Sequence, residues 1–524
     1  MKKITAFLLL TALVLSAVAC ASTTDTSNSA NTSDSVSSKP EPEPTDLKID
    51  KNCAVVLPVS ATKSEIAAAD SIIAALEKHG ITLQKYDDSA DAASNEILVG
   101  KTARTASQNA LNGLTDGDFA IVVNTNEFGN SIALAANDPD GIALCTDYFI
   151  YSYLQKESDL TLPLDLNFNH KRSNKQINGI NVSDYTIVYA KEGVNSDKNI
   201  QAAKYQDTVT EFVTYLKKAT GVTLNAIPDT ENLTSFEHLI LFGNTARPED
   251  NILYNPKFIA SGAKAYTVKL LNNGNLALAG TNAISTLAAG KAAVLAMLGE
   301  KQETNDLNCS GKADLIHVAC IGDSITYGTN STDPSMQSYP VYLQRMLGYS
   351  YYVEKYGAPS HSLIETDTQS FLKHEYFKKS TAAKPDVVIV MLGTNDCRTQ
   401  KWEDSAYKNW ADPARKQAFL SSGKKLIDAY RAANKEVQII FATCPTVPQD
   451  AWLGTDWTSR IRKYGNPTIR SLAESNDCPV IDVFTFSTKH PEMFEGGDGL
   501  HPQNEQYQIL AQGIYDLCRD IIKQ

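Results

Sequence analysis

The sequence predicts an α/β protein whose C-terminal part is a doubly wound, five-stranded parallel sheet, preceded by two repeated small α/β units. Three observations lead to this prediction. Five apolar runs in the C-terminal part alternate with helical patterns, which is the order that builds a parallel sheet. Two earlier stretches end an apolar strand with the same pattern, Gly-x-Thr-Ala-Arg. The length of 524 residues corresponds to about three domains of ordinary size.

The composition is that of a folded, acidic protein. Hydrophobic residues make up 43% and charged residues 21% of the chain, which excludes a mostly disordered or collagen-like protein. Lysine and arginine number 48 against 60 acidic residues, so the formal net charge is −12. Nonspecific nucleic-acid binding requires a basic surface, so we expect no nucleic-acid partner. Because the sequence holds no familiar pattern of metal ligands, we expect no metal and no cofactor.

The first 20 residues have the features of an export signal. Lys2 and Lys3 precede an apolar run at 6–15, and the small residues at 16–19 lead to Cys20. This arrangement resembles a bacterial lipobox, which implies a lipoprotein signal peptide over residues 1–20 and lipidation of Cys20. The implied protein is exported and lipid-anchored to the bacterial cell membrane on its extracytoplasmic side. The alternative is an ordinary cleaved signal peptide in which Cys20 is incidental.

The next segment, residues 21–46, consists mostly of Ser, Thr, Asn, Asp and Pro. Such a segment buries too little apolar surface to offset the entropy lost on ordering it. We therefore predict a disordered linker that holds the folded part away from the membrane.

The two similar stretches, 95–104 and 238–247, each lie in a unit of about 110 residues with the order strand, helix, strand, two strands, helix. We assign them to α/β repeat domains at 47–170 and 171–305. The pattern resembles the small α/β domain that precedes the catalytic barrel of β-hexosaminidases and α-glucuronidases. The resemblance implies a mainly structural role, and glycan binding is the alternative.

The C-terminal domain, 312–524, contains the residues on which a function can be argued. Ser324 follows the first apolar strand within Gly-Asp-Ser, Gly357 follows the second, Asn395 follows the third, and His501 precedes the last helix. Open α/β sheets bind ligands at the carboxyl ends of their strands, which is where these residues fall. The predicted strands are 315–321, 351–356, 386–392, 437–443 and 480–484, and the predicted helices are 339–347, 416–433 and 505–522.

These four residues, in this order, resemble the marker residues of the SGNH or GDSL-type hydrolases. The resemblance implies a flavodoxin-like fold and a serine esterase that works through an acyl-enzyme. A serine hydroxyl is a weak nucleophile that needs a base, and histidine is the natural base near neutral pH. His501 is the candidate base, and Asp498, three residues earlier, would orient its ring. The alternatives are a loop-capping role for Asp498 and a different base, His361 or His490.

The resemblance also implies an oxyanion hole, formed by the backbone N–H groups of Ser324 and Gly357 and the side-chain amide of Asn395. The alternatives are that Asn395 is only a turn residue and that Gly357 only supplies a left-handed turn. The segment 355–361 departs from the family pattern, because it lacks an Asn before Gly357 and a second Gly shortly after it.

All four tryptophans fall between residues 402 and 457, in loops that leave the sheet near the predicted site. Trp402, Arg398 and Asp323 are candidates for contact with the substrate; the alternative for the tryptophans is packing of the loops. The motifs at 338–340 and 391–396 look most similar to carbohydrate acetylesterase-like members of the family. This resemblance implies an ester substrate, namely acetyl groups on a polysaccharide. A lipase or thioesterase of the same family, and a non-catalytic surface glycan-binding protein, are the alternatives.

Overall fold

The computed structural model describes residues 46–126, 129–155, 160–191, 200–233, 235–247, 253–299, 307–398, 413–447 and 457–522. Within these residues, no helix combines the length and the apolar character that crossing a bilayer requires. The predicted signal peptide, Cys20 and nearly all of the predicted linker lie outside the described residues.

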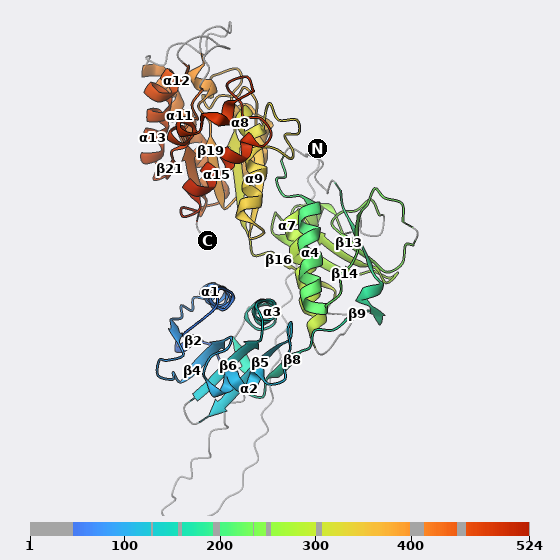
Figure 1. Ribbon diagram of the computed structural model, residues 1–524. Helices are drawn as coiled ribbons and strands as arrows, with labels where there is room; N and C mark the ends of the chain where they lie inside the picture. The colour runs from blue at the N-terminus through green and yellow to red at the C-terminus, as the bar shows by residue number, and fades with distance from the viewer. Residues whose placement is uncertain are drawn as a thin grey trace, which may run out of the picture. The chain divides into compact units, whose positions relative to one another are not determined.

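The C-terminal part contains a five-stranded sheet in which every strand is parallel to its neighbours (Figure 1). The order across the sheet is β18-β17-β19-β20-β21, so the chain moves first to one side of β17 and then to the other. The predicted five-stranded parallel sheet is therefore confirmed. The strands are β17 Ile316–Gly322, β18 Tyr351–Gly357, β19 Val387–Met391, β20 Gln438–Ala442 and β21 Val480–Ile481.

Helices cover both faces of this sheet, because successive side chains of a strand point to opposite sides. Val318 and Cys320 of β17 join one buried apolar cluster, whereas Ala319 and Ile321 join another. The first cluster includes residues of α9 Tyr339–Leu347 and α15 Gln506–Cys518; the second includes residues of α10 Glu375–Ala382, α11 Pro413–Ala433 and α13 Asn466–Glu474.

Two six-stranded sheets precede this one in the chain and share a single strand order. The first is β3-β2-β4-β6-β5-β8 and the second is β12-β11-β13-β15-β14-β16. In both, the fifth strand of the order runs antiparallel to its two neighbours. We call them the first sheet and the second sheet. The repeat-domain boundaries at 170/171 and 305/312 stay predictions.

The strands of the first sheet are β2 Cys53–Leu57, β3 Lys85–Asp87, β4 Asn95–Val99, β5 Phe119–Asn126, β6 Gly129–Ala136 and β8 Asn167–His170, and its helices are α1 Lys63–Glu77, α2 Thr105–Leu111 and α3 Pro139–Phe149. The second sheet has β11 Thr186–Tyr189, β12 Ala226–Pro228, β13 Leu239–Phe242, β14 Ala265–Leu270, β15 Leu276–Gly280 and β16 Cys309–Lys312, with helices α4 Tyr205–Thr220 and α7 Ala283–Leu298. Shorter strands are β1 Asp46–Lys48, β7 Thr161–Pro163, β9 Gln176–Ile177 and β10 Ile180–Asn181, and shorter helices are α6 Pro256–Ile259, α8 Ser324–Tyr327, α12 Trp457–Arg460 and α14 Val483–Lys489.

Two local features differ from the sequence-based expectations. The strand predicted at 480–484 is wrong beyond Ile481, because Asp482 accepts a hydrogen bond from the Thr485 N–H at 3.1 Å and so caps helix α14. The four edge strands of the two six-stranded sheets, β3, β8, β12 and β16, were not expected, so each sheet has six strands where the pattern predicted four.

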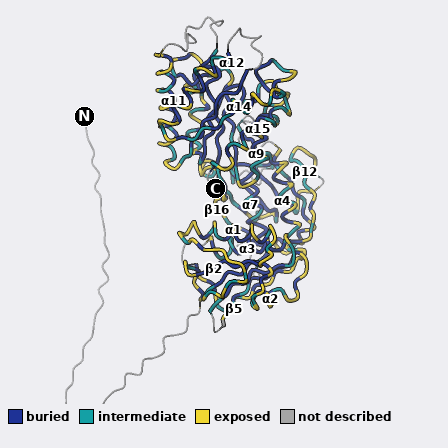
Figure 2. The backbone as a smooth tube through the Cα atoms, turned by 60° about the vertical axis from the view of Figure 1, so that its left-hand side comes forward, coloured by how far each residue is buried: buried dark blue, intermediate teal, exposed yellow. Residues whose placement is uncertain are grey.

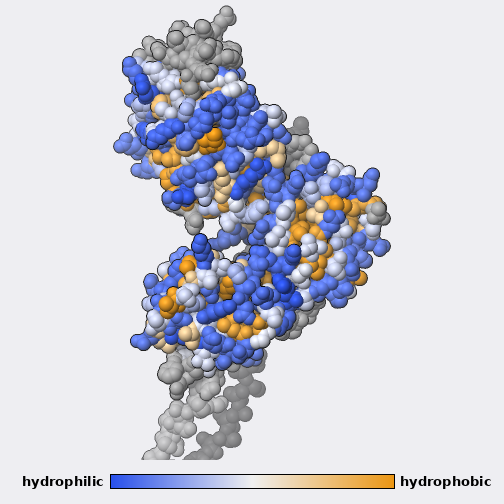
Figure 3. All heavy atoms as spheres, viewed as in Figure 1, coloured by the Kyte–Doolittle hydropathy of each residue, from blue (hydrophilic) through white to orange (hydrophobic). Residues whose placement is uncertain are grey.

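Burial follows the sheets, as Figure 2 shows for the backbone. The strands and the inner sides of the helices are buried, whereas the turns are mostly exposed. On the face drawn in Figure 3, hydrophilic residues cover most of the surface and apolar residues form small, separate groups. Large exposed apolar side chains such as Val59 and Phe236 occur singly along the chain. Single exposed apolar residues of this kind are normal on a folded protein.

Candidate active site

Ser324 lies at the carboxyl end of the first strand of the five-stranded sheet. Gly322 ends β17, and a side chain there would bring a Cβ within 2.8 Å of the Met391 carbonyl oxygen and 2.0 Å of Thr326 Oγ1. Asp323 then caps the short helix α8 by accepting a hydrogen bond from the Ile325 N–H at 3.0 Å. Ser324 is the first residue of α8, and its backbone N–H therefore lacks an acceptor within the helix itself.

The hydroxyl of Ser324 faces an imidazole that is 177 positions away in the chain. Ser324 Oγ lies 2.8 Å from His501 Nε2. The other ring nitrogen, His501 Nδ1, lies 2.6 Å from Asp498 Oδ2. The second oxygen of Asp498 accepts the N–H groups of Leu500 at 3.0 Å and His501 at 2.8 Å. The predicted loop-capping role of Asp498 and its contact with the ring thus occur together.

The charge of Asp498 determines which nitrogen of the His501 ring carries the proton. Burial by itself raises the pKa of Asp498, but the hydrogen bonds from the side chain and backbone of His501 outweigh it and lower that pKa to about 2. An ionised carboxylate only accepts hydrogen bonds, so His501 Nδ1 carries the proton. When the ring is neutral, Nε2 has a lone pair that can accept the hydrogen of the Ser324 hydroxyl. Ser324 and His501 are only 8% and 7% exposed, which limits competition from water for this hydrogen bond.

The two competing histidines have other partners. His361 Nδ1 lies 2.8 Å from the carbonyl oxygen of Pro359, and His490 Nδ1 lies 2.8 Å from Glu492 Oε1. Among the described residues, His501 is the histidine that is hydrogen-bonded to Ser324.

Gly357 and Asn395 lie on either side of the turn that holds Ser324. A Cβ on Gly357 would lie 2.1 Å from the backbone nitrogen of Tyr327, so glycine is required by the close approach of α8 and not by a left-handed turn. Asn395 begins the 3-10 turn η4 Asn395–Cys397 after β19. Its side-chain nitrogen donates to the His361 carbonyl oxygen at 3.0 Å and, more weakly, to Asp323 Oδ2 at 3.3 Å.

The three candidates for substrate contact differ in their surroundings. Asp323 is 1% exposed, and its carboxylate accepts from Ile325 and Asn395, so its burial does not support a direct contact with substrate. Burial raises the pKa of Asp323 to about 6, although the hydrogen bond from Ile325 and the charges of His501 and Arg398 oppose the shift. Arg398 is partly exposed and follows η4. Trp402 lies outside the described residues, as do Trp410 and Trp452.

Trp457 is the fourth tryptophan, and the structure describes it. The side chain is buried, and its indole N–H donates to the carbonyl oxygen of Thr394 at 2.9 Å. This tryptophan therefore packs and anchors the η4 turn, as the packing alternative predicted, and it is not a platform for a sugar ring.

Several residues that shape the site were not singled out from the sequence. Lys355 is buried and donates to the carbonyl oxygens of Tyr327 at 2.9 Å and Pro334 at 2.6 Å, which ties the end of α8 to β18. Ser360 adopts a left-handed backbone with φ of 66°, in the loop where the family pattern has a second glycine. The signal for Lys355 in the sequence was a lysine inside a predicted strand, two positions before Gly357.

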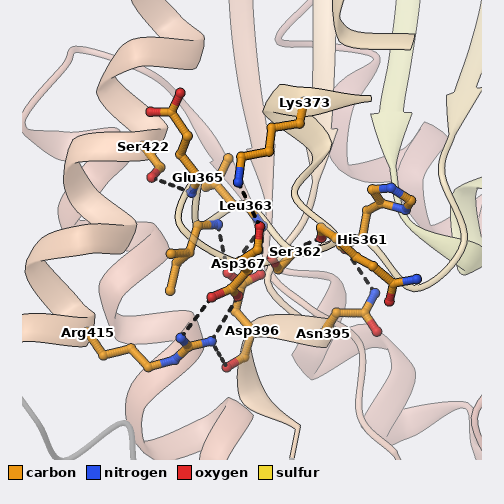
Figure 4. Close-up of polar contacts among 12 residues, drawn as sticks. His361, Ser362, Leu363, Glu365, Asp367, Lys373, Asn395, Asp396, Arg415 and Ser422 are labelled. Carbon is orange, nitrogen blue, oxygen red and sulfur yellow. Dashed lines mark hydrogen bonds and ion pairs between the residues drawn. The ribbon is translucent and has the colours of Figure 1, made fainter. Parts of the chain in front are cut away.

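A buried charged cluster lies next to Asn395 and was also missed (Figure 4). Asp396 accepts hydrogen bonds from the N–H groups of Leu363 and Ile364, and Arg415 pairs with Asp367. These contacts join three segments that are far apart in the sequence, so no local pattern could reveal them.

Comparison with known proteins agrees with the resemblance found in the C-terminal part. Residues 320–509 match the GDSL-like Lipase/Acylhydrolase family. A curated relative, the acetylxylan esterase of Xylanibacter ruminicola, is 37% identical over 214 residues, which cover 39% of this chain and 43% of the relative. The chain thus spans less than half the length of the curated relative it matches. The expectation of an ester-bond hydrolase agrees with the family that residues 320–509 match.

Solved structures with partial likeness include a carbohydrate acetylesterase family member from Sinorhizobium meliloti, at 18% identity and a TM-score of 0.30, covering 39% of this chain and 98% of that one. The inhibitor-bound aryl esterase of M. smegmatis has 15% identity and a TM-score of 0.31, covering 40% of this chain and 100% of that one. TM-scores of this size support no conclusion about chemistry.

Proposed function

We propose that this protein is a serine ester hydrolase in which Ser324 is the nucleophile, His501 the base and Asp498 the group that orients the base. The observation that supports this most directly is the continuous hydrogen-bonded chain from Ser324 Oγ through the ring of His501 to Asp498. Its position at the carboxyl end of β17 is where open α/β sheets bind their ligands.

The proposed reaction proceeds in two balanced halves. Ser324 Oγ attacks the carbonyl carbon of the ester while His501 Nε2 takes the hydroxyl proton, and the negative charge of Asp498 stabilises the imidazolium. The tetrahedral intermediate collapses when His501 returns the proton to the leaving alcohol, which leaves an acyl group on Ser324. Water then attacks this acyl group, with His501 again accepting a proton and returning it to Ser324 Oγ. The products are the alcohol and the carboxylic acid.

The negative charge that develops on the carbonyl oxygen needs donors that already point at it. In our proposal these are the backbone N–H groups of Ser324 and Gly357 and the side-chain amide of Asn395, of which one hydrogen stays on the His361 carbonyl oxygen while the other leaves its weaker contact with Asp323 for the oxyanion. The close approach of Gly357 to α8 and the contact of the Asn395 amide with Asp323 Oδ2 at 3.3 Å support this assignment, because both bring a donor to the turn of Ser324.

We further propose that the substrate is an acetyl ester on a polysaccharide, with acetylated xylan the first to test. The name of the curated relative supports this choice, within the part of that protein that the chain matches. We also propose that the protein is exported and is held at the membrane by a lipid on Cys20, so that the active domain meets polymers outside the cell.

Covalent labelling tests the nucleophile directly. An alkyl fluorophosphonate forms a stable adduct with an activated serine, so the wild-type protein should gain one phosphonyl group on the peptide that contains Ser324. His501→Ala should label at least about 10³-fold more slowly, because the hydroxyl then has no base. Labelling at a different serine, or at an unchanged rate in His501→Ala, would overturn the proposed mechanism.

Acetate release tests the substrate. The wild-type protein is incubated with acetylated xylan and with a panel of other acetylated plant and bacterial glycans, and acetate is measured against Ser324→Ala. We expect release from acetylated xylan. Turnover of p-nitrophenyl acetate without acetate release from any glycan would support the esterase activity but contradict the proposal that the substrate is a polysaccharide.

Fractionation tests the anchor. The wild-type protein should sediment with membranes, whereas Cys20→Ser should appear in the soluble extracytoplasmic fraction. Equal distribution of the two proteins would reject lipidation at Cys20.

A further inference from the structure

Asn395 and Asp396 are adjacent in the chain and both hold the loop 361–367. Asn395 does so as a hydrogen-bond donor and Asp396 as an acceptor. The side-chain amide of Asn395 donates to the His361 carbonyl oxygen at 3.0 Å. The carboxylate of Asp396, which is completely buried, accepts the Leu363 N–H at 3.0 Å and 3.1 Å and the Ile364 N–H at 3.1 Å. A movement of the Asp396 carboxylate would therefore shift the loop whose carbonyl oxygen orients the amide of Asn395.

Arg415 connects this pair to a third segment. Its guanidinium donates to both oxygens of Asp367, at 3.2 Å and 3.1 Å, and also to the backbone carbonyl oxygen of Asp396 at 3.4 Å. Asp367 belongs to the same loop, because its N–H donates to the Ile364 carbonyl oxygen at 3.2 Å. Figure 4 shows Arg415 reaching from α11 to the centre of this network, with Asn395 at its far edge.

Stability alone is a poor explanation for such a cluster. Removing ions from water costs several kcal/mol per ion, and apolar residues of similar volume often stabilise a fold as well or better. Burial raises the pKa of Asp396 to about 6, and the charge of Asp367 adds to that shift, which the hydrogen bonds and Arg415 oppose. The role that fits the cluster better is therefore to fix the positions of the segments that its directional hydrogen bonds connect.

We propose that Asp367, Arg415 and Asp396 are positioning residues, which hold the side-chain amide of Asn395 in the orientation that the oxyanion requires. This inference rests on the proposed function of the site. None of the three is assigned a contact with substrate. They act through two intermediaries, namely the loop 361–367 and the backbone of η4.

A matched pair exists in the first sheet and serves as the control. Arg104 donates to both oxygens of Glu96, at 3.1 Å and 3.0 Å, and to the backbone carbonyl oxygen of Ala90 at 2.8 Å. This pair has the same chemistry and nearly the same contacts as Arg415, but it belongs to another sheet and contacts no residue of the candidate site. Arg104→Met should therefore change stability without changing turnover.

The experiment is a double-mutant cycle with p-nitrophenyl acetate, at a temperature where every variant is folded by circular dichroism. Arg415→Met alone should lower kcat by about 10–100-fold at nearly constant KM, since a misplaced donor weakens only the transition state. Arg415→Lys should recover part of the loss. In the Asn395→Ala background, adding Arg415→Met should lower kcat by less than about twofold, because the amide that Arg415 positions is already absent.

Each outcome has one meaning. The inference would be overturned if Arg415→Met lowered kcat by the same factor in the wild type and in Asn395→Ala, or if it left kcat unchanged in the wild type. The proposed esterase activity would be unaffected by either result. An inactive wild-type protein would overturn the proposed function, and the inference with it. If Arg415→Met fails to fold, Asp367→Asn replaces it in the same cycle, because the amide keeps the volume and one acceptor; additive losses would again count against the inference.

Discussion

The first sheet and the five-stranded sheet both have a buried serine just beyond the carboxyl end of a parallel strand, and the two hydroxyls have different partners. Beyond β4 of the first sheet, Ser107 Oγ donates to the Gly100 carbonyl oxygen at 2.6 Å. Beyond β17, Ser324 Oγ faces His501 Nε2 at 2.8 Å. A carbonyl oxygen cannot take the proton of a hydroxyl, whereas a neutral imidazole can. Under the proposed function, the partner of the hydroxyl, rather than its burial or its place on the sheet, is what distinguishes Ser324 from Ser107.

The carboxylates of the two regions follow the same rule. In the first sheet, Glu65 accepts the N–H groups of Thr62 at 2.8 Å and Lys101 at 3.0 Å and the hydroxyl of Thr62 at 2.8 Å, so these partners are backbone groups and one hydroxyl. Asp498 also accepts backbone N–H groups, but its remaining oxygen holds the ring of His501. One additional contact to a titratable ring is what separates a structural carboxylate from one that can support a base.

The largest effect is expected when the two serines are exchanged for alanine. Ser324→Ala should lower kcat/KM for p-nitrophenyl acetate by about 10⁴–10⁶-fold, because no nucleophile remains. Ser107→Ala should leave kcat/KM unchanged and lower the free energy of unfolding by about 1 kcal/mol through the lost hydrogen bond. Comparable activities of the two variants would show that the comparison has no functional meaning.

The second effect concerns the two aspartates. Asp498→Asn should reduce kcat by about 10⁴-fold, since the amide no longer holds His501 with its proton on Nδ1. The control is Asp138→Asn, which changes the cap of α3; Asp138 accepts the N–H groups of Asp140 and Gly141, both at 3.0 Å. We expect this control to lower the melting temperature and to leave kcat as in the wild type. A loss below about tenfold in Asp498→Asn would mean that Asp498 only caps its loop.

The third effect compares two buried asparagines. Asn395→Ala should lower kcat by about 10²–10³-fold with little change in KM, as expected for loss of one oxyanion donor. Asn282 caps helix α7 by accepting the N–H groups of Ile284 at 3.0 Å and Ser285 at 2.9 Å. Asn282→Ala should cost about 1 kcal/mol of stability and no activity. A change in KM alone for Asn395→Ala would assign the amide to binding of the substrate instead.

The fourth effect is a difference in how stability depends on pH. Burial raises the pKa of Asp323 to about 6, so its contribution to stability is present below the ordinary value near 4 and is lost as the pH rises through 6. The unfolding free energy of the wild type relative to Asp323→Asn should therefore fall by roughly 1–3 kcal/mol between pH 4 and pH 7. Urea titrations at several pH values measure this difference, and a difference that rises with pH would contradict the assignment.

Asp118 in the first sheet should behave in the opposite way. Burial raises the pKa of this carboxyl, but hydrogen bonds from Arg172 and Thr115 outweigh it and hold that pKa far below the usual range. Its stabilising contribution is present above the ordinary value near 4 and is lost as the pH falls below it. Asp118→Asn should thus destabilise the protein relative to the wild type by a constant amount from pH 5 to pH 8.

The smallest effect is expected in a polar hollow of about 650 Å³ at the strand ends of the first sheet, whose lining includes Lys101 and Arg172. Lys101→Ala and Arg172→Ala should change turnover of p-nitrophenyl acetate by less than about twofold, because neither residue has a part in the proposed chemistry. If either variant loses acetate release from xylan but keeps turnover of the small ester, the first sheet takes part in binding the polymer.

Local patterns were sufficient for most of the five-stranded sheet. The apolar runs of β17 and β19 predicted buried parallel strands, and the helix predicted at 339–347 is α9, which spans Tyr339–Leu347. The pattern failed at 480–484, where the capping side chain of Asp482 overrides the apolar signal. The turns at the strand ends could also be predicted, because glycine, serine and asparagine are favoured in turns for reasons that depend on only a few neighbouring residues.

The chain alone therefore determined which residues fall at the carboxyl ends of the strands, since periodicity and turn chemistry act over short distances. Only the tertiary structure decided that Ser324 and His501 come within 2.8 Å, that Asn395 is oriented by the His361 carbonyl oxygen, and that Arg415 ties the loop at 361–367 to η4. These contacts join residues that are 19 to 177 positions apart in the chain. Their geometry depends on how the helices pack on both faces of the sheet, and no local sequence pattern encodes that packing.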